Sequence, residues 1–357
     1  MAEGLTFRNF TKEDLTRISN FMKSVFAPDL SIRSHEPEYY EWKLYKNPVL
    51  HGEMWLAEVG NKIVGMKSIT PKRMRVLGEI LDAAEVGDTF THPNYQRQGI
   101  FTTLVKAERE HGLDNRMKLI YGTPNQNALP GWLKQNYAQI PINLHRLVKP
   151  VYPKQLIETK LHFSPLASIL CPLIEISSRA VFKISTIGMT KRDVFISQES
   201  SFPNDIDTLW EQASKDYEVI IVRTRDYLQW RYITNPDTYS ILTARNKSGA
   251  TSGYMVTKLT SSGDKKTGFV VDFLTIEDDP NIFSNLLAVS LEEFFQKKVN
   301  FVHVWTVKGS FYYKILLKFG FFPYDRVTLI CYKNEIVDEL LNKARKWHFT
   351  IGDSDNI

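Results

Sequence analysis

The segment YYEWKLYKNP, residues 39–48, returns in altered form as YLQWRYITNP, residues 227–236, with Tyr, Trp, Asn and Pro in the same register. In the first copy Tyr39 and Trp42 are three positions apart, which places them on one face of a helix that Pro48 ends. A motif repeated in this way indicates two copies of one structural unit. We expect the repeated helix to serve mainly in packing.

The segments that follow the motif have the same order in both halves of the chain. Hairpins are predicted around residues 60–62 and 246–249, and apolar strands at residues 83–90 and 268–275. Each half then closes with a strand, a helix and a final strand, and this order predicts an α/β fold with a mixed sheet in each unit. The closing strands are residues 118–123 and 142–148 in the first half and residues 300–307 and 326–332 in the second.

We therefore divide the chain into four parts. The first unit spans residues 1–150 and is followed by a helical connector over residues 151–190. The second unit spans residues 191–345, and residues 346–357 are expected to form a flexible tail.

Composition sets limits on the class of protein. With 357 residues, 43% of them hydrophobic and 12% aromatic, the chain can fill the cores of two domains. A scattered net charge of +5 does not demand nucleic acid as a partner. The apolar stretch 166–182 is interrupted by Pro172, Glu175 and Arg179, so it predicts an amphipathic connector and no membrane span.

Cysteine usage and the start of the chain bear on the compartment. Cys171 and Cys331 lie far apart, and neither has a second cysteine or a histidine at ligand spacing, so we expect no disulfide scaffold and no metal site. The first residues show no basic-then-apolar run of a secretion or transit signal. A reducing, cytoplasmic location fits both observations.

The stretch THPNYQRQGIFTTL, residues 91–104, carries the clearest chemical signal. It reads as a strand end, a proline turn and a polar loop that runs directly into a helix. Gly99 allows backbone N–H groups to curve around an anion, and the helix N-terminus adds positive partial charge. Gln96, Arg97 and Gln98 add side-chain donors. The pattern predicts a diphosphate ligand, and the alternative is a plain connecting turn.

This stretch resembles the acetyl-coenzyme A pyrophosphate loop of the GNAT N-acetyltransferase superfamily, whose pattern is Gln/Arg-x-x-Gly-x-Gly/Ala between a strand and a helix. Gln96 and Gly99 match, whereas Phe101 stands where the last small residue usually lies. The order of elements in residues 1–150 resembles the whole superfamily fold. The resemblance implies acetyl-CoA as acyl-donor cosubstrate and a tandem pair of GNAT-like units, of which the C-terminal copy is degenerate.

The resemblance also implies which residues contact the cofactor. In this superfamily the strand before the loop opens away from its neighbour, and its main chain pairs with the pantetheine arm. An Asn that opens a later helix touches the same arm, and here it is Asn125, in TPNQNALPGWLKQNY. The implied cofactor-binding residues are Thr89, Phe90, Thr91, Gln96, Arg97, Gln98, Gly99, Ile100, Phe101, Thr102 and Asn125.

Attack of an amine on a thioester needs a base that collects a proton near neutral pH. Glu85 precedes Gln96 at the spacing of the catalytic glutamate in one branch of the superfamily, and burial would raise its pKa. The alternative is that Glu85 pairs with a lysine or caps a backbone group. Strand alternation puts Asp88 on the opposite face, so the two carboxylates are not expected to act as a pair, and Asp82 is expected to face solvent.

The general acid is less clear, because Trp132 stands where many relatives place a tyrosine. An indole N–H is not a useful acid at neutral pH, so Tyr121, Tyr137 or a direct solvent route are the alternatives. His92 and His111 are further candidates for the base, although a loop surface position is expected for His92.

In the second half the position of the phosphate loop is taken by TIEDDPNIFSNLL, residues 275–287. Glu277, Asp278 and Asp279 bring three negative charges there, and no glycine supplies the turn. Like charges at short range oppose a pyrophosphate, so only the first unit is expected to bind acyl-CoA.

Two further groups of residues in the second unit have open interpretations. Three arginines are candidates to grip an anionic acceptor, with a solvated surface as the preferred alternative, and three aromatic residues line either an acceptor cleft or, by preference, the core. The arginines are Arg223, Arg225 and Arg231, and the aromatic residues are Trp305, Tyr312 and Tyr313.

The sequence as a whole predicts an N-acetyltransferase that moves an acetyl or related acyl group from acetyl-CoA to a primary amine of a small molecule. The Trp-x-x-x-x-Asn-Pro helix and the TPNQN segment look like those of acetyltransferases in surface-polysaccharide synthesis, which favours an aminosugar or a sugar nucleotide. One alternative is a non-catalytic acyl-CoA-binding or regulatory module. Another is an aminoacyl-tRNA-dependent peptidyl-transfer relative, for which a more basic surface than +5 is expected.

Overall fold

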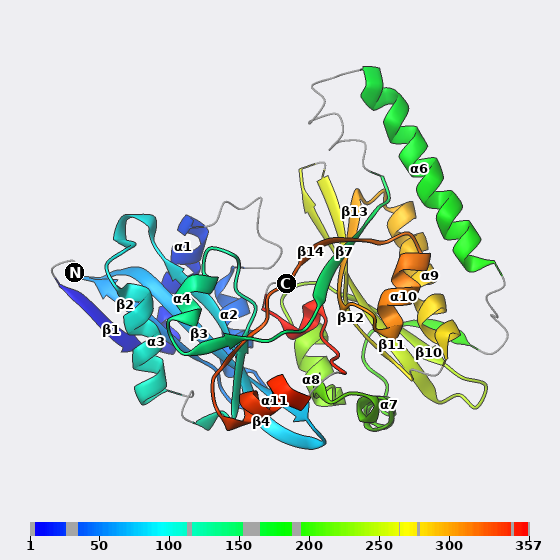
Figure 1. Cartoon of the computed structure of the whole chain (residues 1–357). Helices are drawn as coiled ribbons and strands as arrows, with labels where there is room; N and C mark the ends of the chain where they lie inside the picture. Colours follow the sequence, from blue (N-terminus) through cyan, green and yellow to red (C-terminus); the bar gives the residue numbers. More distant parts are fainter. Residues whose placement is uncertain are drawn as a thin grey trace.

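The computed structural model describes residues 4–25, 35–112, 116–152, 165–187, 194–263, 265–276, 279–343 and 346–355. Two mixed sheets lie next to each other, each with its own helices, and the C-terminal segment of the chain lies between them (Figure 1). Two α/β units are thus confirmed.

The first sheet has the strand order β1-β2-β3-β4-β5-β15-β6, and β9 pairs with the far end of β3. Its long central strands β3 and β4 form the predicted meander with β2. The strands are β1 (Leu5–Asn9), β2 (Glu53–Val59), β3 (Lys62–Val76), β4 (Glu79–Thr91), β5 (Leu119–Gly122), β6 (Tyr137–Gln139), β9 (Val219–Ile221) and β15 (Ile330–Tyr332). The helices of this unit are η1 (Lys12–Asp14), α1 (Leu15–Val25), α2 (Pro37–Tyr45), η3 (Pro93–Tyr95), α3 (Ile100–His111) and α4 (Leu129–Leu133).

The second sheet has the order β14-β7-β13-β12-β11-β10-β8, and α9 and α10 cover one of its faces (Figure 1). Its strands are β7 (Leu144–Pro150), β8 (Phe195–Glu199), β10 (Ser240–Arg245), β11 (Thr251–Ser262), β12 (Lys265–Thr275), β13 (Phe301–Val307) and β14 (Phe322–Arg326). The remaining helices in the second half of the chain are α7 (Ile206–Ala213), η5 (Ser214–Asp216), α8 (Arg225–Leu228), η6 (Gln229–Ile233), α9 (Pro280–Gln296), α10 (Phe311–Lys318), α11 (Glu335–Lys343) and η7 (Ile351–Asp353). Of these, α11 lies at the first sheet, where Asn334 before it donates to the carbonyl oxygen of Lys118 before β5 (Figure 1).

The two units exchange their closing strands, which corrects the expected boundaries. β7, from the first half, pairs with β13 of the second sheet, for example at Leu147 and Val304. β15, from the second half, pairs with β5 at Ile330 and Gly122, inside the first sheet. A division at residue 150 therefore cuts across both sheets. The sequence marks where each strand occurs, but its local pattern does not specify the two strands between which it is placed.

The repeated motif joins the two units. The Trp42 and Trp230 rings stack with centroids 4.8 Å apart, and both side chains are buried. Trp42 Nε1 donates to the carbonyl oxygen of Trp230 at 2.8 Å, and Trp230 Nε1 donates to that of Trp42 at 3.2 Å. Packing is confirmed as the role of the motif. Each copy satisfies the buried indole of the other, so the pair closes the interface between the units.

The C-terminal segment is not a flexible tail over its described residues 346–355. His348, Phe349 and Asp353 are buried, and Arg223 lies 2.8 Å from Asp353 and 3.1 Å from Asp272 of β12. The segment packs against the part of β12 that extends past its last parallel pair with β13, Val270 with Val304. We call residues 346–355 the tail segment. The segment alone did not reveal this packing, because Arg223 and Asp272 lie far away in the sequence.

The connector contains the helix α6 (Pro165–Thr186), while residues 153–164 and 188–190 lie outside the described part. The hydroxyl of Ser178 in α6 donates a hydrogen bond to the carbonyl oxygen of Pro150 at 2.7 Å, and Ile176 and Ile184 are exposed. No helix among the described residues combines the length and apolar character needed to cross a membrane. Cys171 and Cys331 are both buried free thiols, and the described residues contain no cluster of potential metal ligands.

Candidate functional site

Strands β4 and β5 pair over a short distance and then part. Their parallel ladder runs from Ala83 to Glu85, which lies beside Tyr121, whereas β4 continues to Thr91 and stays paired with β3. A register shift between Met66 and Ser68 of β3 marks a bulge on this stretch. The main chain of β4 beyond Glu85, including Thr89, Phe90 and Thr91, therefore lacks a β5 partner within the described chain. This is the opening that the resemblance implied.

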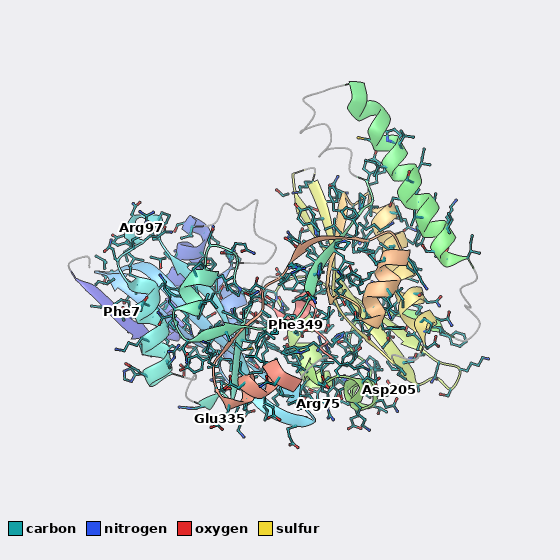
Figure 2. All side chains as sticks on the ribbon, viewed as in Figure 1. Phe7, Arg75, Arg97, Asp205, Glu335 and Phe349 are labelled. Carbon is teal, nitrogen blue, oxygen red and sulfur yellow. The ribbon has the colours of Figure 1, made fainter. Side chains whose placement is uncertain are left out.

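The loop after β4 leads directly into α3, as predicted. Gly99 is the N-cap with φ of 81°, and Arg97 also has a positive φ of 61°. Gln96, Arg97 and Gly99 are exposed, Gln98 is partly exposed, and Figure 2 shows Arg97 at the outer surface of the first unit. Because the first N–H groups of a helix have no partner within it, those of Ile100, Phe101 and Thr102 are available to an anion.

Phe101 fills the space that a small residue would leave open. Its ring meets the indole of Trp132 edge-on, with centroids 5.2 Å apart. It also contacts Gly131 so closely that a Cβ there would lie 3.1 Å from the ring. Phe101 therefore packs α3 onto α4, and Trp132 is buried behind it. Asn125 is exposed and caps the turn before α4, where its Oδ1 accepts from the N–H of Ala128 at 2.9 Å.

Glu85 is the last residue of β4 in the ladder with β5, and it is buried. Its Oε1 accepts from the N–H of Asp355 at 2.8 Å, and its Oε2 lies 3.9 Å from Lys72 Nζ without a hydrogen-bond donor in the described structure. Burial and the carboxylate of Asp355 raise the pKa of Glu85 to about 8, against the opposing charge of Lys72. Glu85 thus has both a lysine neighbour and a backbone donor, and its pKa is nevertheless raised above its usual value.

Lys43 of α2 pairs with two other carboxylates near Glu85. Its Nζ lies 2.6 Å from Asp88 and 2.5 Å from Asp355, and it donates to Ser68 at 3.1 Å. The prediction that strand alternation separates Asp88 from the face of Glu85 is wrong. The bulge changes the alternation, and Asp88 has a positive φ of 42°. Asp88 therefore reaches the same group of charges.

Gly87 makes room for the tail segment beside Glu85. A Cβ at Gly87 would lie 2.5 Å from Oδ2 of Asp355 and 3.3 Å from Nζ of Lys43. Any larger residue would displace the carboxylate of Asp355 from β4.

The candidate acid Tyr121 lies beside Glu85 but is engaged with the tail segment. Its hydroxyl donates to the carbonyl oxygen of Asp353 at 2.6 Å, and burial together with the charge of Glu85 raises its pKa well above the usual value. Tyr137 is buried against Trp132, with ring centroids 4.8 Å apart. The structure thus gives both tyrosines packing or anchoring contacts.

The remaining titratable candidates lie outside this group. His92 accepts from the N–H of Asn94 in the turn before the loop, and His111 is exposed at the end of α3. Asp82 is exposed near the start of β4, as predicted, with Arg73 at 3.7 Å.

Two of the three arginines of the second unit are buried, which overturns the preferred expectation of a solvated surface. Arg231 donates to the carbonyl oxygens of Gly352 at 3.1 Å and Ser354 at 3.0 Å, and Arg223 pairs with Asp353. Both hold the tail segment of the chain itself. Arg225 is only partly buried and donates to Phe202 at 3.0 Å.

A signal for the missed residues was present in the opening motif. A basic residue follows the tryptophan in both copies, Lys43 after Trp42 and Arg231 after Trp230. Both basic side chains are buried, and both contact the tail segment.

The second unit has no counterpart of the exposed loop in its described residues. Asp279 caps α9 by accepting from the N–H of Asn281 at 2.8 Å, while Glu277 and Asp278 lie outside the described residues. Tyr312 and Tyr313 are buried, which confirms their place in the core, and Trp305 is partly buried.

Comparison with known proteins supports the fold described above. Residues 6–131 match the family model of the acetyltransferase (GNAT) domain. No curated protein matches the sequence. A tandem GNAT protein from the clavulanic acid biosynthesis pathway aligns at 15% identity and TM-score 0.59 over 92% of this chain and 98% of its own.

Two further solved structures share the fold. N-myristoyltransferase of Saccharomyces cerevisiae, with bound myristoyl-CoA, has TM-score 0.64 at 11% identity over 93% of this chain and 79% of its own. A GCN5-related N-acetyltransferase from Anabaena variabilis has TM-score 0.60 at 11% identity over 92% and 72%. At these identities the likeness establishes the fold of the chain, which is the tandem arrangement expected from the repeated motif.

Proposed function

We propose that the first unit, whose residues 6–131 match the model of the acetyltransferase (GNAT) domain, transfers an acyl group from acyl-CoA to a primary amine. One observation carries the proposal. β4 parts from β5 immediately after a buried carboxylate, Glu85, and then leads through an exposed glycine loop into α3. In this proposal the opening binds the thioester, Glu85 is the base and the loop binds the diphosphate, so that all three lie along β4 and the loop that follows it.

In this proposal the cofactor lies along β4 and ends at α3. The main chain of Thr89, Phe90 and Thr91, which lies beyond the ladder of β4 with β5, pairs with the pantetheine arm, and Asn125 borders it. The diphosphate is bound by the loop Gln96–Gly99 and by the first N–H groups of α3, from Ile100 to Thr102. Acetyl-CoA is the donor we propose.

The reaction is a direct transfer. The amine nitrogen attacks the thioester carbonyl, a C–N bond forms, and the C–S bond breaks as the coenzyme leaves as its thiolate. The proton lost by nitrogen passes to Glu85, directly or through one water, and the pKa of about 8 suits that exchange. A thiol titrates near pH 8.5, so the thiolate takes its proton from solvent while Tyr121 holds the tail segment.

The acceptor is proposed only as a small primary amine. The Trp-containing helix that favoured an aminosugar is used in the contact between Trp42 and Trp230, so it gives no support to a particular acceptor. Aminosugars and their nucleotide forms belong in the acceptor panel with simple amines and amino acids.

Two measurements test the proposal. Isothermal titration with acetyl-CoA should show one binding site per chain, because within the described part of the chain the loop occurs in the first unit alone. Release of free thiol should then depend on an added amine from the panel. Absence of acetyl-CoA binding would refute the proposal. Binding without amine-dependent thiol release across the panel would favour the non-catalytic module.

A further inference from the structure

The tail segment begins beside β9 of the first sheet, packs against β12 of the second sheet, and ends at the candidate site of the first unit. Arg223 and Arg231 of the second unit hold it at Asp353, Gly352 and Ser354. Figure 2 labels Phe349 of this segment between the two units. The segment therefore links β12 of the second sheet, through Thr350 and Asp272, to Glu85 of β4 in the first.

At its end the tail segment bonds to the strands that part in the first unit. Tyr121 of β5 donates to the carbonyl oxygen of Asp353, and the hydroxyls of Thr123 and Ser354 lie 2.8 Å apart. Asp355 is placed over β4, where its N–H donates to Glu85. The contacts bridge β4 and β5 where their ladder ends.

We propose that Asp355 is a positioning residue for Glu85, through which the second unit contributes to proton transfer in the first. The N–H of Asp355 fixes Oε1 of Glu85, and its carboxylate makes a second negative charge beside it less favourable. The inference rests on the proposed role of Glu85 as base.

The geometry of Glu85 supports this assignment. Asp355 holds Oε1 at 2.8 Å, so Oε2 is the oxygen left to accept a proton. Oε2 is buried and has no hydrogen-bond donor in the described structure, and Lys72 at 3.9 Å is beyond hydrogen-bond distance. A buried carboxylate oxygen without a donor has a high affinity for a proton.

Several charged side chains surround Glu85. Among them, the carboxylate of Asp355 opposes the ionisation of Glu85 most directly. Burial and, after it, the charge of Asp355 raise the pKa of Glu85, whereas Lys72 and Lys43 lower it. Asp355 is itself held by Lys43 and by the hydroxyl of Thr70 at 3.3 Å. The other titratable groups near this cluster are Asp88, Tyr121, Tyr227 and Arg231.

The substitution Asp355→Asn tests the proposal, because it keeps the backbone N–H and the side-chain shape while removing the charge. Without the carboxylate Glu85 ionises more easily, so the acidic limb of kcat/KM should move to lower pH by about one unit. Asp82→Asn is the matched control, since it makes the same change at an exposed position of β4, the strand that carries Glu85. The control should leave the limb unmoved.

A second readout does not require turnover. Titration of the full chain labelled with 13C at glutamate carboxyl carbons, with the Glu85 signal assigned by its loss in Glu85→Gln, gives the midpoint of Glu85 directly. A downward shift in Asp355→Asn and not in Asp82→Asn is expected. An unchanged midpoint would overturn the positioning role, even in an active enzyme. A shifted midpoint in a protein whose turnover ignores Glu85→Gln would instead refute the base in the proposed function.

Discussion

The two units place a buried carboxylate on matching strands and treat it in opposite ways. Glu85 is the last residue of β4 that pairs with β5, and Asp272 lies two residues beyond the last pair of β12 with β13. Asp272 accepts hydrogen bonds from Arg223, Tyr254 and Thr350. Although burial opposes ionisation, Arg223 lowers the pKa of Asp272, whereas the pKa of Glu85 is raised. The number and charge of the donors decide which carboxylate accepts protons near neutral pH.

The tail segment makes different contacts in the two units. In the second unit it packs along the part of β12 beyond the β13 ladder, next to Asp272. In the first unit only its end, at Ser354 and Asp355, reaches the opening. The tail segment thus covers the open part of β12 in the second unit, and its end contacts the opening of the first unit.

The largest predicted effect comes from removing the charge that fixes the second carboxylate. Arg223→Met leaves Asp272 and Asp353 buried without their shared partner, and should cost about 3–5 kcal/mol of unfolding free energy. Urea unfolding followed by tryptophan fluorescence measures it. The same substitution at Arg245, which forms a half-exposed pair with Asp205, should cost less than about 1 kcal/mol. Equal costs at the two sites would show that Arg223 does not fix the tail segment by its charge.

The next effect concerns the first carboxylate. Glu85→Gln should lower kcat by about 10²–10³-fold with little change in acetyl-CoA affinity, because it removes proton transfer but keeps the side-chain volume. The wild-type rate should rise through pH 8 as Glu85 becomes ionised, and the variant should lose that limb. Glu79→Gln makes the same change at an exposed residue of β4 and should leave the pH profile intact. A wild-type profile in Glu85→Gln would exclude this residue as the base.

A third prediction concerns the loop that only the first unit presents among the described residues. Gly99→Asp adds a negative charge beside the proposed diphosphate and a side chain at a φ of 81°, so acetyl-CoA affinity should fall at least about tenfold. Gly249→Asp is a matched control, because Gly249 has a φ of 83° and equally open surroundings in the second unit. Isothermal titration compares them. Equal affinity in both variants would mean that the loop does not bind the cofactor.

Much of the fold could be predicted because it depends on local patterns. The hairpins around residues 60–62 and 246–249 follow from turn residues between apolar runs, and both are present. The repeated Trp motif identified two units before any contact was known. The exchange of β7 and β15 could not be predicted, because strand pairing across the chain is not encoded in the local pattern of either strand.

The site divides in the same way. Glu85 and the loop to Gly99 were found by spacing along one strand and its following helix. Lys43 and Asp355 were missed because they meet Glu85 and Asp88 only through the tertiary fold, with Asp355 270 positions from Glu85. Alternation failed at Asp88 because a bulge depends on the partner strand.

The smallest predicted effect tests the contact between the two copies of the repeated motif. Trp42→Phe removes a 2.8 Å indole bond, and Trp230→Phe removes its 3.2 Å counterpart. Each should cost about 0.5–1.5 kcal/mol, since each carbonyl keeps a second donor, Thr234 at Trp230 and Lys46 at Trp42, and the larger cost is expected at Trp42 because its bond is shorter. Urea unfolding of both single variants and the double variant gives their coupling. Strictly additive costs would mean that the stacked pair acts as two independent packing residues, and that the units are held together elsewhere.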